Sequence, residues 1–234
     1  MTQLLYLENT YFFNEQAQII EVWNDNFGDY IILDRTIFYP QWWGQPSDTW
    51  KIRSWENTFQ VTKCRLDEYG KVYHYGTCIS WMLKIWNTTH LEIDQNNRIL
   101  NARNHSAWHL LDVAMYELWY SDDLSPTKWY HFQDWAYVEY QWEFHEWAEI
   151  FIQKIEQKMK ELTQQNIPII VEYEWLWELE APLWKTPRYV SFEGYKWCWC
   201  WGTHVKNSWE IREVSIRKVK YKKWILRVSY EITQ

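Results

Sequence analysis

The chain has 234 residues, of which 47% are hydrophobic, so it is long enough for one large domain or two small ones with a sizeable core. Its formal net charge of −7 excludes binding to nucleic acid through overall positive charge, and any such role must rest on a local basic patch. The sequence contains no run of eighteen apolar residues and no signal-peptide pattern, so we expect a cytoplasmic location and no membrane partner.

Residues 1–94 predict a small antiparallel β-barrel. Short runs rich in β-branched and aromatic residues alternate with turn-forming segments such as NDNFGD and DEYGK, and no helical period of useful length occurs. Strands at this spacing are typical of a barrel. The predicted strands cover residues 16–22, 30–39, 59–66, 71–77 and 90–93. The polar run DQNN then predicts a junction, so we expect a second domain over residues 95–234.

Two helices are predicted after this junction. The first, over residues 105–119, has an apolar stripe at the helical period and carries His105 and His109 on the opposite face. The second, over residues 146–165, has one apolar face and ends before Pro168, which favours a structural role. Strand-like segments follow it to the end of the sequence.

Two separated pairs of residues indicate a metal site. His105 and His109 are four residues apart on a helix, so both imidazoles lie on one face and can share an ion. Cys200 and His204 offer a thiolate and an imidazole, which complete a tetrahedral set that favours zinc. Taken singly, these residues also fit surface histidines and a buried cysteine. The spacing gives no such role to the four remaining histidines, His74, His90, His131 and His145.

A local basic patch lies near the end of the sequence. Between positions 212 and 227, seven basic residues stand against the single acid Glu213, in a segment that reads as a strand pair. The patch predicts contact with nucleic-acid phosphates, and the alternative is a solvated strand pair with ordinary lysines. The four cysteines are too few for a disulfide framework.

Three motifs carry a family resemblance. NARNHSAWHLL resembles the helix motif of the editing domain shared by alanyl- and threonyl-tRNA synthetases, and CWGTH resembles the Cys-x-x-x-His element of that domain. FYPQWWGQPSDTW is similar to the motif FYPxGGGQPSDxG of the AlaX family of free-standing alanyl-tRNA editing proteins. The motifs occur in the family's order and the resemblance runs over nearly the whole chain, which looks like a medium-length, two-domain member.

The resemblance implies an α+β fold, in which an antiparallel β-barrel of translation-factor type precedes an α/β editing domain with one bound Zn²⁺. It implies hydrolysis, in trans, of serine or glycine wrongly attached to tRNA(Ala), which would be the partner. The implied zinc ligands are His105, His109, Cys200 and His204. Motif positions that line the family's amino-acid pocket match Thr36, Gln45 and Asp48, although a strand threonine and a polar loop also explain these residues. The predicted contacts with tRNA are Arg217, Lys218, Lys220, Lys222 and Lys223.

Two other functions are weighed against hydrolysis. A non-catalytic tRNA-binding or structural zinc protein would keep the same fold, and four protein ligands indeed make a closed metal site of the structural kind. A zinc protease is disfavoured because the helix lacks the glutamate beside the first histidine. Oligomeric state and the choice between serine and glycine are left open.

The composition differs from that expected for the family in having too few glycines and too many tryptophans. The chain has 6 glycines and 21 tryptophans, whereas average usage predicts roughly sixteen glycines. The family has glycine or another small residue at motif positions that are here Trp42, Trp43, Trp50, Trp108 and Trp201. We favour replacement of glycine by tryptophan over an aromatic-rich natural variant. The indole of Trp108 is expected on the metal side of its helix, where it would crowd the substrate.

Overall fold

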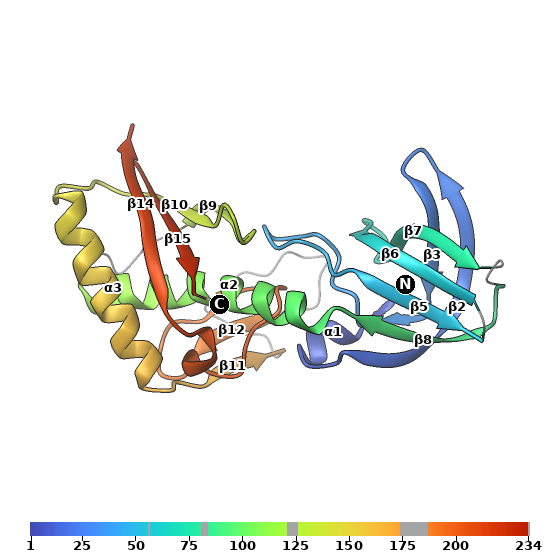
Figure 1. The fold of residues 1–234 in the computed structure, drawn as a ribbon. Coiled ribbons are helices and arrows are strands. Elements are labelled where there is room, and N and C mark those ends of the chain that lie inside the picture. Colours follow the sequence, from blue (N-terminus) through green and yellow to red (C-terminus); the bar gives the residue numbers. More distant parts are fainter. Residues whose placement is uncertain (56, 81–83, 121–125, 174–186, 234) are drawn as a thin grey trace. The chain divides into compact units, whose positions relative to one another are not determined.

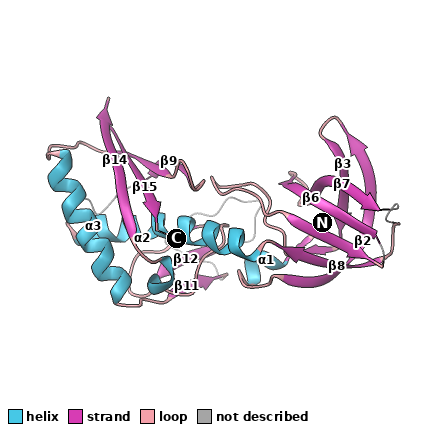
Figure 2. Cartoon of the chain, in the orientation of Figure 1, coloured by secondary structure: helices cyan, strands magenta, loops and turns pink. Residues whose placement is uncertain are grey.

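A computed structural model describes residues 1–55, 57–80, 84–120, 126–173 and 187–233 of the chain (Figure 1). The chain divides into two compact units, Met1–Leu100 and Asn101–Gln234. Strands dominate the first unit, whereas helices and strands mix in the second, so the predicted α+β class is confirmed (Figure 2). Among the described residues, no helix is long and apolar enough to cross a membrane.

The first unit is built on a closed six-stranded barrel in the order β2-β3-β7-β6-β5-β8, and every neighbouring pair is antiparallel. Its strands are β2 (Asn14–Asp25), β3 (Gly28–Leu33), β5 (Trp50–Ser54), β6 (Asn57–Leu66), β7 (Val72–Ser80) and β8 (Thr88–Ile93). A short parallel pair, β1 (Gln3–Leu4) with β4 (Arg35–Thr36), and helix α1 (Leu5–Glu8) complete the unit.

Alternation along the strands fills the barrel with aliphatic side chains, among them Ile19, Ile31 and Ile52, which are fully buried. A Cβ atom at Gly76 would lie 1.9 Å from the Gln60 carbonyl oxygen, so the close approach of β6 and β7 requires glycine there. Sequence patterning missed β5, and it wrongly predicted one strand over residues 30–39, where the structure separates β3 from β4.

Helix α2 (Gln95–Glu117) begins ten residues before the predicted start at residue 105. The polar run DQNN, which predicts a junction, supplies the N-cap and the first three residues of this helix. The Asp94 side chain accepts a hydrogen bond from the Asn97 backbone N–H at 3.1 Å, in the manner of a helix N-cap. The apolar stripe that predicts the helix is absent from its polar first turn. The predicted start therefore lies too far along the sequence.

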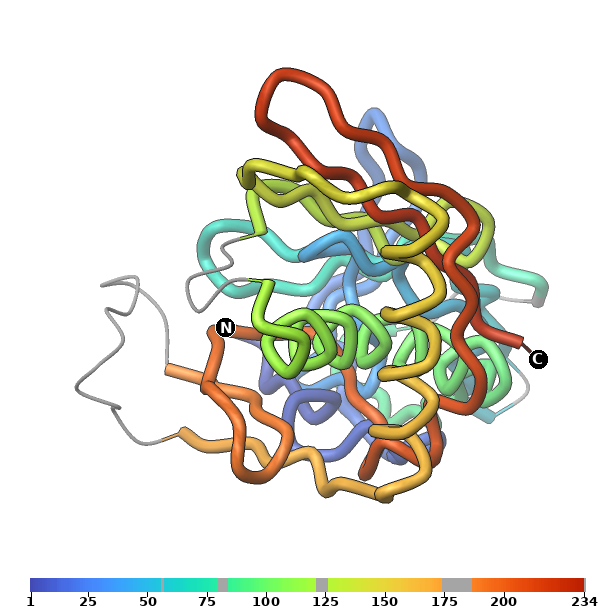
Figure 3. The backbone as a smooth tube through the Cα atoms, turned by 90° about the vertical axis from the view of Figure 1, so that its left-hand side faces the viewer, coloured from blue at the N-terminus to red at the C-terminus, as the bar shows by residue number. Residues whose placement is uncertain are grey.

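The second unit contains two sheets and the rest of the helices. A four-stranded sheet has the order β14-β15-β10-β9, and a three-stranded sheet has the order β11-β12-β13. Helix α3 (Ala148–Gln164) buries Phe151, Ile155 and Met159 and packs beside β14, as Figure 3 shows with α3 in gold and β14 in red. The remaining bounds are β9 (Pro126–Tyr130), β10 (Tyr137–Gln141), β11 (Ile169–Glu172), β12 (Tyr189–Phe192), β13 (Cys198–Trp199), the 3-10 helix η1 (Ser208–Ile211), β14 (Val214–Lys222) and β15 (Ile225–Ile232).

Tryptophan occupies backbone positions that normally require glycine. Among the described residues, nine that are not glycine have positive φ, and six of these are Trp43, Trp50, Trp55, Trp86, Trp119 and Trp224. A side chain with a Cβ atom is strained in this region, and bulky residues are rare there. Positive φ at six tryptophans supports the hypothesis that they stand at glycine positions.

Candidate metal centre

Helix α2 and the loop after β13 bring the four predicted metal ligands together. His105, His109, Cys200 and His204 are all buried, and one nitrogen or sulfur atom from each lies within 4.8 Å of the others. The Cys200 Sγ atom is 3.0 Å from His105 Nε2 and 3.2 Å from His204 Nε2. Two helical residues one turn apart and two residues of a tight loop thus surround one point.

A second cysteine fixes the tautomer of His109. The Cys198 thiol donates to the Val190 carbonyl at 3.4 Å, so its sulfur is left to accept a hydrogen bond from Nδ1–H of His109 at 3.2 Å. The proton then resides on Nδ1, and Nε2 of His109 carries a lone pair. This Nε2 is buried and has no hydrogen-bond partner among the described residues.

Ser106 lies beside the ring of His204. Its Oγ accepts a hydrogen bond from the Val205 backbone N–H, and it lies 3.2 Å from Nδ1 of His204. An ion bound to Nε2 of His204, the atom beside Cys200, would leave the proton on Nδ1, where Ser106 Oγ can accept it. Outer partners of this kind orient metal ligands in many proteins.

Burial sets the charge of the centre. It lowers the pKa of His109 to about 3 and the pKa values of His105 and His204 well below the usual range, so all three imidazoles are neutral at pH 7. Burial also raises the pKa of the Cys200 thiol to about 11, against the opposing effect of the Arg188 guanidinium. Neutral imidazoles with one thiol suit a divalent ion of borderline softness, so the donor set fits zinc.

A glycine, Gly202, and a tryptophan, Trp108, lie next to the histidine rings of this centre. A Cβ atom at Gly202 would lie 2.3 Å from Cε1 of His105, so the ligand loop approaches the ring only because this residue is glycine. The Trp108 ring is 4.3 Å from the His109 ring and 5.6 Å from the His105 ring, measured between centroids. The Trp108 indole therefore lies beside the rings of two predicted metal ligands.

Comparisons with known proteins identify similar proteins over most of the chain. No protein-family model matches the chain. The alanyl-tRNA editing protein AlaX-L of Pyrococcus horikoshii is 29% identical over 94% of the chain, which spans 54% of that relative. AlaX-M of Saccharolobus solfataricus is 28% identical, and the alignment covers 99% of both chains. The alanine–tRNA ligase of Thermococcus kodakarensis is 25% identical over 94% of this chain, which spans 24% of the ligase.

Over nearly its whole length the chain is similar to proteins of the AlaX family. It spans about half of AlaX-L but the whole length of AlaX-M. Four residues that the AlaX resemblance implied as metal ligands are the four that the structure gathers.

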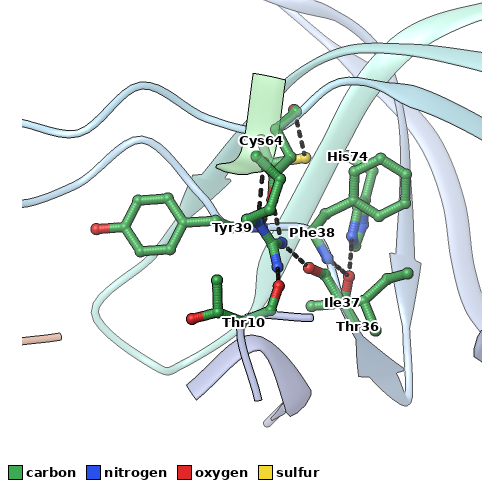
Figure 4. A network of polar contacts seen from close by, with 9 residues as sticks. Thr10, Thr36, Ile37, Phe38, Tyr39, Cys64 and His74 are labelled. Carbon is green, nitrogen blue, oxygen red and sulfur yellow. Dashed lines mark hydrogen bonds and ion pairs between the residues drawn. The ribbon is translucent and has the colours of Figure 1, made fainter. Parts of the chain in front are cut away.

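The residues predicted from sequence to line an amino-acid pocket lie in the first unit, whereas the predicted metal ligands lie in the second. Thr36 is buried, and its hydroxyl is 2.8 Å from Nε2 of His74, while its oxygen accepts from the Phe38 backbone N–H (Figure 4). Because Nδ1 of His74 contacts the Ile31 carbonyl, its Nε2 accepts the hydrogen of Thr36. The Thr36 hydroxyl therefore has both a donor and an acceptor contact inside the barrel.

Asp48 is likewise held inside the first unit of the chain. Its carboxylate forms a buried ion pair with Arg98 and accepts the Tyr39 backbone N–H at 2.7 Å. The same guanidinium donates to the Thr10 carbonyl at 2.8 Å, so it ties three segments of the unit together. Gln45 is fully buried in the loop between β4 and β5. For Thr36, Gln45 and Asp48, contact with an amino acid stays a prediction.

The predicted tRNA contacts lie on the β14–β15 hairpin, and all five of these side chains are exposed. Lys218, Lys220 and Lys222 follow one another at every second position and so share one face of β14. Arg217 is partly engaged, because it donates to the Asp134 carbonyl at 2.6 Å. Across the described part of the chain, no ion pair involves Lys218, Lys220, Lys222 or Lys223.

Sequence reasoning missed three residues of the metal centre: Ser106, Cys198 and His131. Ser106 and Cys198 contact ligands that are 98 and 89 positions away in the chain. The His131 ring lies 4.6 Å from the His105 ring, between centroids. Spacing along the sequence carries no signal for such contacts, although the closeness of Cys198 to Cys200 offered a weak one.

Proposed function

We propose that the chain hydrolyses the ester bond between tRNA(Ala) and a wrongly attached serine or glycine, as a zinc-dependent proofreading enzyme that acts in trans. The observation that carries the proposal is the buried group of three neutral histidines and one thiol in a chain whose AlaX relatives are alanyl-tRNA editing proteins. His105, His109, Cys200 and His204 would hold the ion. Bound zinc supplies electrostatic polarisation of a carbonyl group or of water.

The residues of the chain contribute orientation and exclusion of water. Cys198 directs the lone pair of His109 toward the centre, and Ser106 would accept Nδ1–H of a metal-bound His204. The ligands are buried, so an ester that reaches them leaves bulk water, and electrostatic interactions with it become stronger. We further propose that Thr36, Gln45 and Asp48 shape the pocket for the amino acid.

The tRNA would contact the basic face of the β14–β15 hairpin. Arg217, Lys218, Lys220, Lys222 and Lys223 are exposed there. Phosphate contacts from a few cations give affinity without sequence specificity, and they explain how a chain with net charge −7 can bind RNA.

One observation favours a second candidate, a tRNA-binding or structural zinc protein without turnover. Four protein ligands would fill a zinc site of the structural kind, and the Trp108 ring packs against two of these residues. In that case the metal would stabilise the fold and the indole would exclude the substrate.

Deacylation assays separate the two candidates. Seryl-tRNA(Ala) and glycyl-tRNA(Ala) are incubated with the chain, with the chelator-treated chain, and with the Cys200→Ser variant, and free amino acid is measured. The enzyme proposal expects hydrolysis that the chelator abolishes and that added zinc restores. Metal-loaded protein that binds tRNA(Ala) but releases no amino acid above the uncatalysed rate would establish the second candidate instead.

A further inference from the structure

His131 is a buried histidine for which the proposed metal site has no use. It follows β9, is 0% exposed, and lies 4.6 Å from the His105 ring and 5.0 Å from the Trp108 ring, between centroids. It thus comes from the end of a strand of the four-stranded sheet, whereas the candidate ligands come from helix α2 and from the loop after β13.

A chain of hydrogen bonds decides which nitrogen of His131 carries the proton. The Tyr230 hydroxyl donates to the Asn104 backbone carbonyl at 2.9 Å. Its oxygen therefore accepts a hydrogen bond from Nδ1–H of His131, at 2.8 Å. The lone pair of His131 is then on Nε2, and this atom is buried without a hydrogen-bond partner among the described residues.

A buried acceptor without a partner costs free energy, so it requires an explanation such as a ligand that supplies the missing hydrogen bond. A fifth metal ligand is disfavoured, because the described residues that can hold an ion form a four-membered set without His131 and zinc sites of this kind are four-coordinate. The remaining candidate partner for Nε2 of His131 is a hydrogen-bond donor on a molecule that binds at the centre. Within the aminoacyl group of such an ester, the available donors are the α-amino group and, in serine, the side-chain hydroxyl.

We propose that Nε2 of His131 accepts a hydrogen bond from the aminoacyl group while the ester is held at the metal centre. The proposal rests on the proposed function and adds a residue that contacts the substrate. A donor on the substrate would replace the lost hydration of Nε2, and an analogue without that donor would leave Nε2 unpaired.

Two substitutions distinguish the roles of the two ring nitrogens of His131. Asparagine in His131→Asn keeps a donor near the Nδ1 position for Tyr230 but removes the group at Nε2. Glutamine in His131→Gln places an amide near the Nε2 position instead. His90→Asn is the matched control, because His90 is an exposed histidine on β8.

Binding and turnover are then both measured. The binding probe is a seryl or glycyl amide of 3′-amino-3′-deoxyadenosine, which is not hydrolysed, and metal content is determined in parallel. We expect His131→Asn to weaken probe binding and to lower kcat/KM by roughly ten- to hundredfold with unchanged zinc content. His131→Gln should recover part of this loss, and His90→Asn should match the parent chain.

The outcomes are distinct. A loss with the seryl compounds alone assigns the hydroxyl as the donor, and an equal loss with the glycyl compounds assigns the α-amino group. Equal probe binding by the parent and by His131→Asn overturns the proposal, as does loss of zinc from His131→Asn, which would make His131 a metal ligand. A parent chain that binds the probe but never hydrolyses tRNA esters counts against the proposed hydrolysis alone.

Discussion

Ser106 and Cys198 are not among the predicted metal ligands, yet they lie 3.2 Å from Nδ1 of the predicted ligands His204 and His109. Cys198 leaves Nε2 of His109 unprotonated, and Ser106 can accept Nδ1–H of His204 once Nε2 of that ring binds an ion. The ligands themselves could be predicted from sequence, because helical spacing and a short Cys-to-His interval place donors within reach of one ion. Their partners could not, because they meet only when segments far apart in the chain fold together.

Removal of an outer partner should weaken metal binding without abolishing it. We expect Ser106→Ala to lower zinc affinity by about ten- to hundredfold, because His204 loses the acceptor that fixes its ring. Cys200→Ser should lower it further, since a hydroxyl replaces a thiolate poorly at a zinc site. Competition with a chromophoric chelator measures both affinities, and Ser215→Ala on β14 is the control. An unchanged affinity in Ser106→Ala would show that the His204 tautomer is fixed by other contacts.

At the scale of elements, the β14–β15 hairpin combines two features, a basic face and a strained turn. After the irregularity between Ile216 and Lys218, alternate lysines of β14 lie on one side of the hairpin. Arg227 pairs across from Lys220, but its guanidinium is 2.7 Å from Glu139, so the lysines supply most of the available charge.

Charge reversal on this face tests its role in binding tRNA. Lys220→Glu with Lys222→Glu should weaken tRNA affinity, and it should reduce the dependence of affinity on salt, because fewer counterions are released. Zinc content should not change. The control is Lys154→Glu with Lys160→Glu, which alters net charge equally from exposed positions on α3. Equal affinity in the hairpin variant and the parent would mean that the face is only solvated.

The turn of the same hairpin tests the glycine hypothesis. Lys222 pairs with Ile225, so Lys223 and Trp224 form a two-residue turn in which both φ angles are positive, at 51° and 64°. This turn strongly prefers glycine. We expect Trp224→Gly to raise the free energy of unfolding by about 1–2 kcal/mol through relief of left-handed strain.

The matched control for the turn is Trp23→Gly. Trp23 is 68% exposed on β2 and is not among the residues with positive φ. Glycine within a strand should lower the free energy of unfolding by about 0.5–1 kcal/mol, the opposite sign. Denaturant unfolding measures the free energy of unfolding of both variants. A lower free energy of unfolding in Trp224→Gly than in the parent would show that packing of the indole stabilises the fold by more than the strained backbone destabilises it.

At the scale of the whole molecule, the barrel followed from strand spacing, the fold class followed from the family resemblance, and the four candidate metal ligands followed from motif spacing. The strand that was missed, β5, begins at Trp50, which has φ of 142°. Turn positions could not be read reliably because glycine, the residue that marks them, is scarce in this chain. The excess of tryptophan thus hides the signals on which sequence reading depends.

If tryptophan stands at glycine positions throughout, restoring glycine should raise activity. We expect the variant with Trp42, Trp43, Trp108 and Trp201 all replaced by glycine to hydrolyse seryl-tRNA(Ala) faster than the parent chain. Each overpacked site typically costs about 1–3 kcal/mol, and Trp108 packs directly on two ligand rings. Zinc content should be equal in the two proteins, and equal rates would show that the centre tolerates the indoles. An intact mass of the natural protein below 29.3 kDa, by whole multiples of the difference between tryptophan and glycine, would support the hypothesis directly.

Burial of the metal centre determines how many protons its ligand side chains release when they bind an ion. At pH 7 the three histidines have no ligand proton to lose, because burial keeps the pKa of His109 near 3 and lowers those of His105 and His204 well below the usual range. The Cys200 thiol, with its pKa raised to about 11, must give up its proton. Zinc uptake should therefore release about one proton, and apparent affinity should rise about tenfold for each pH unit between roughly pH 6 and 9. Calorimetry in buffers of different ionisation enthalpy counts that proton, and Cys200→Ser should release none.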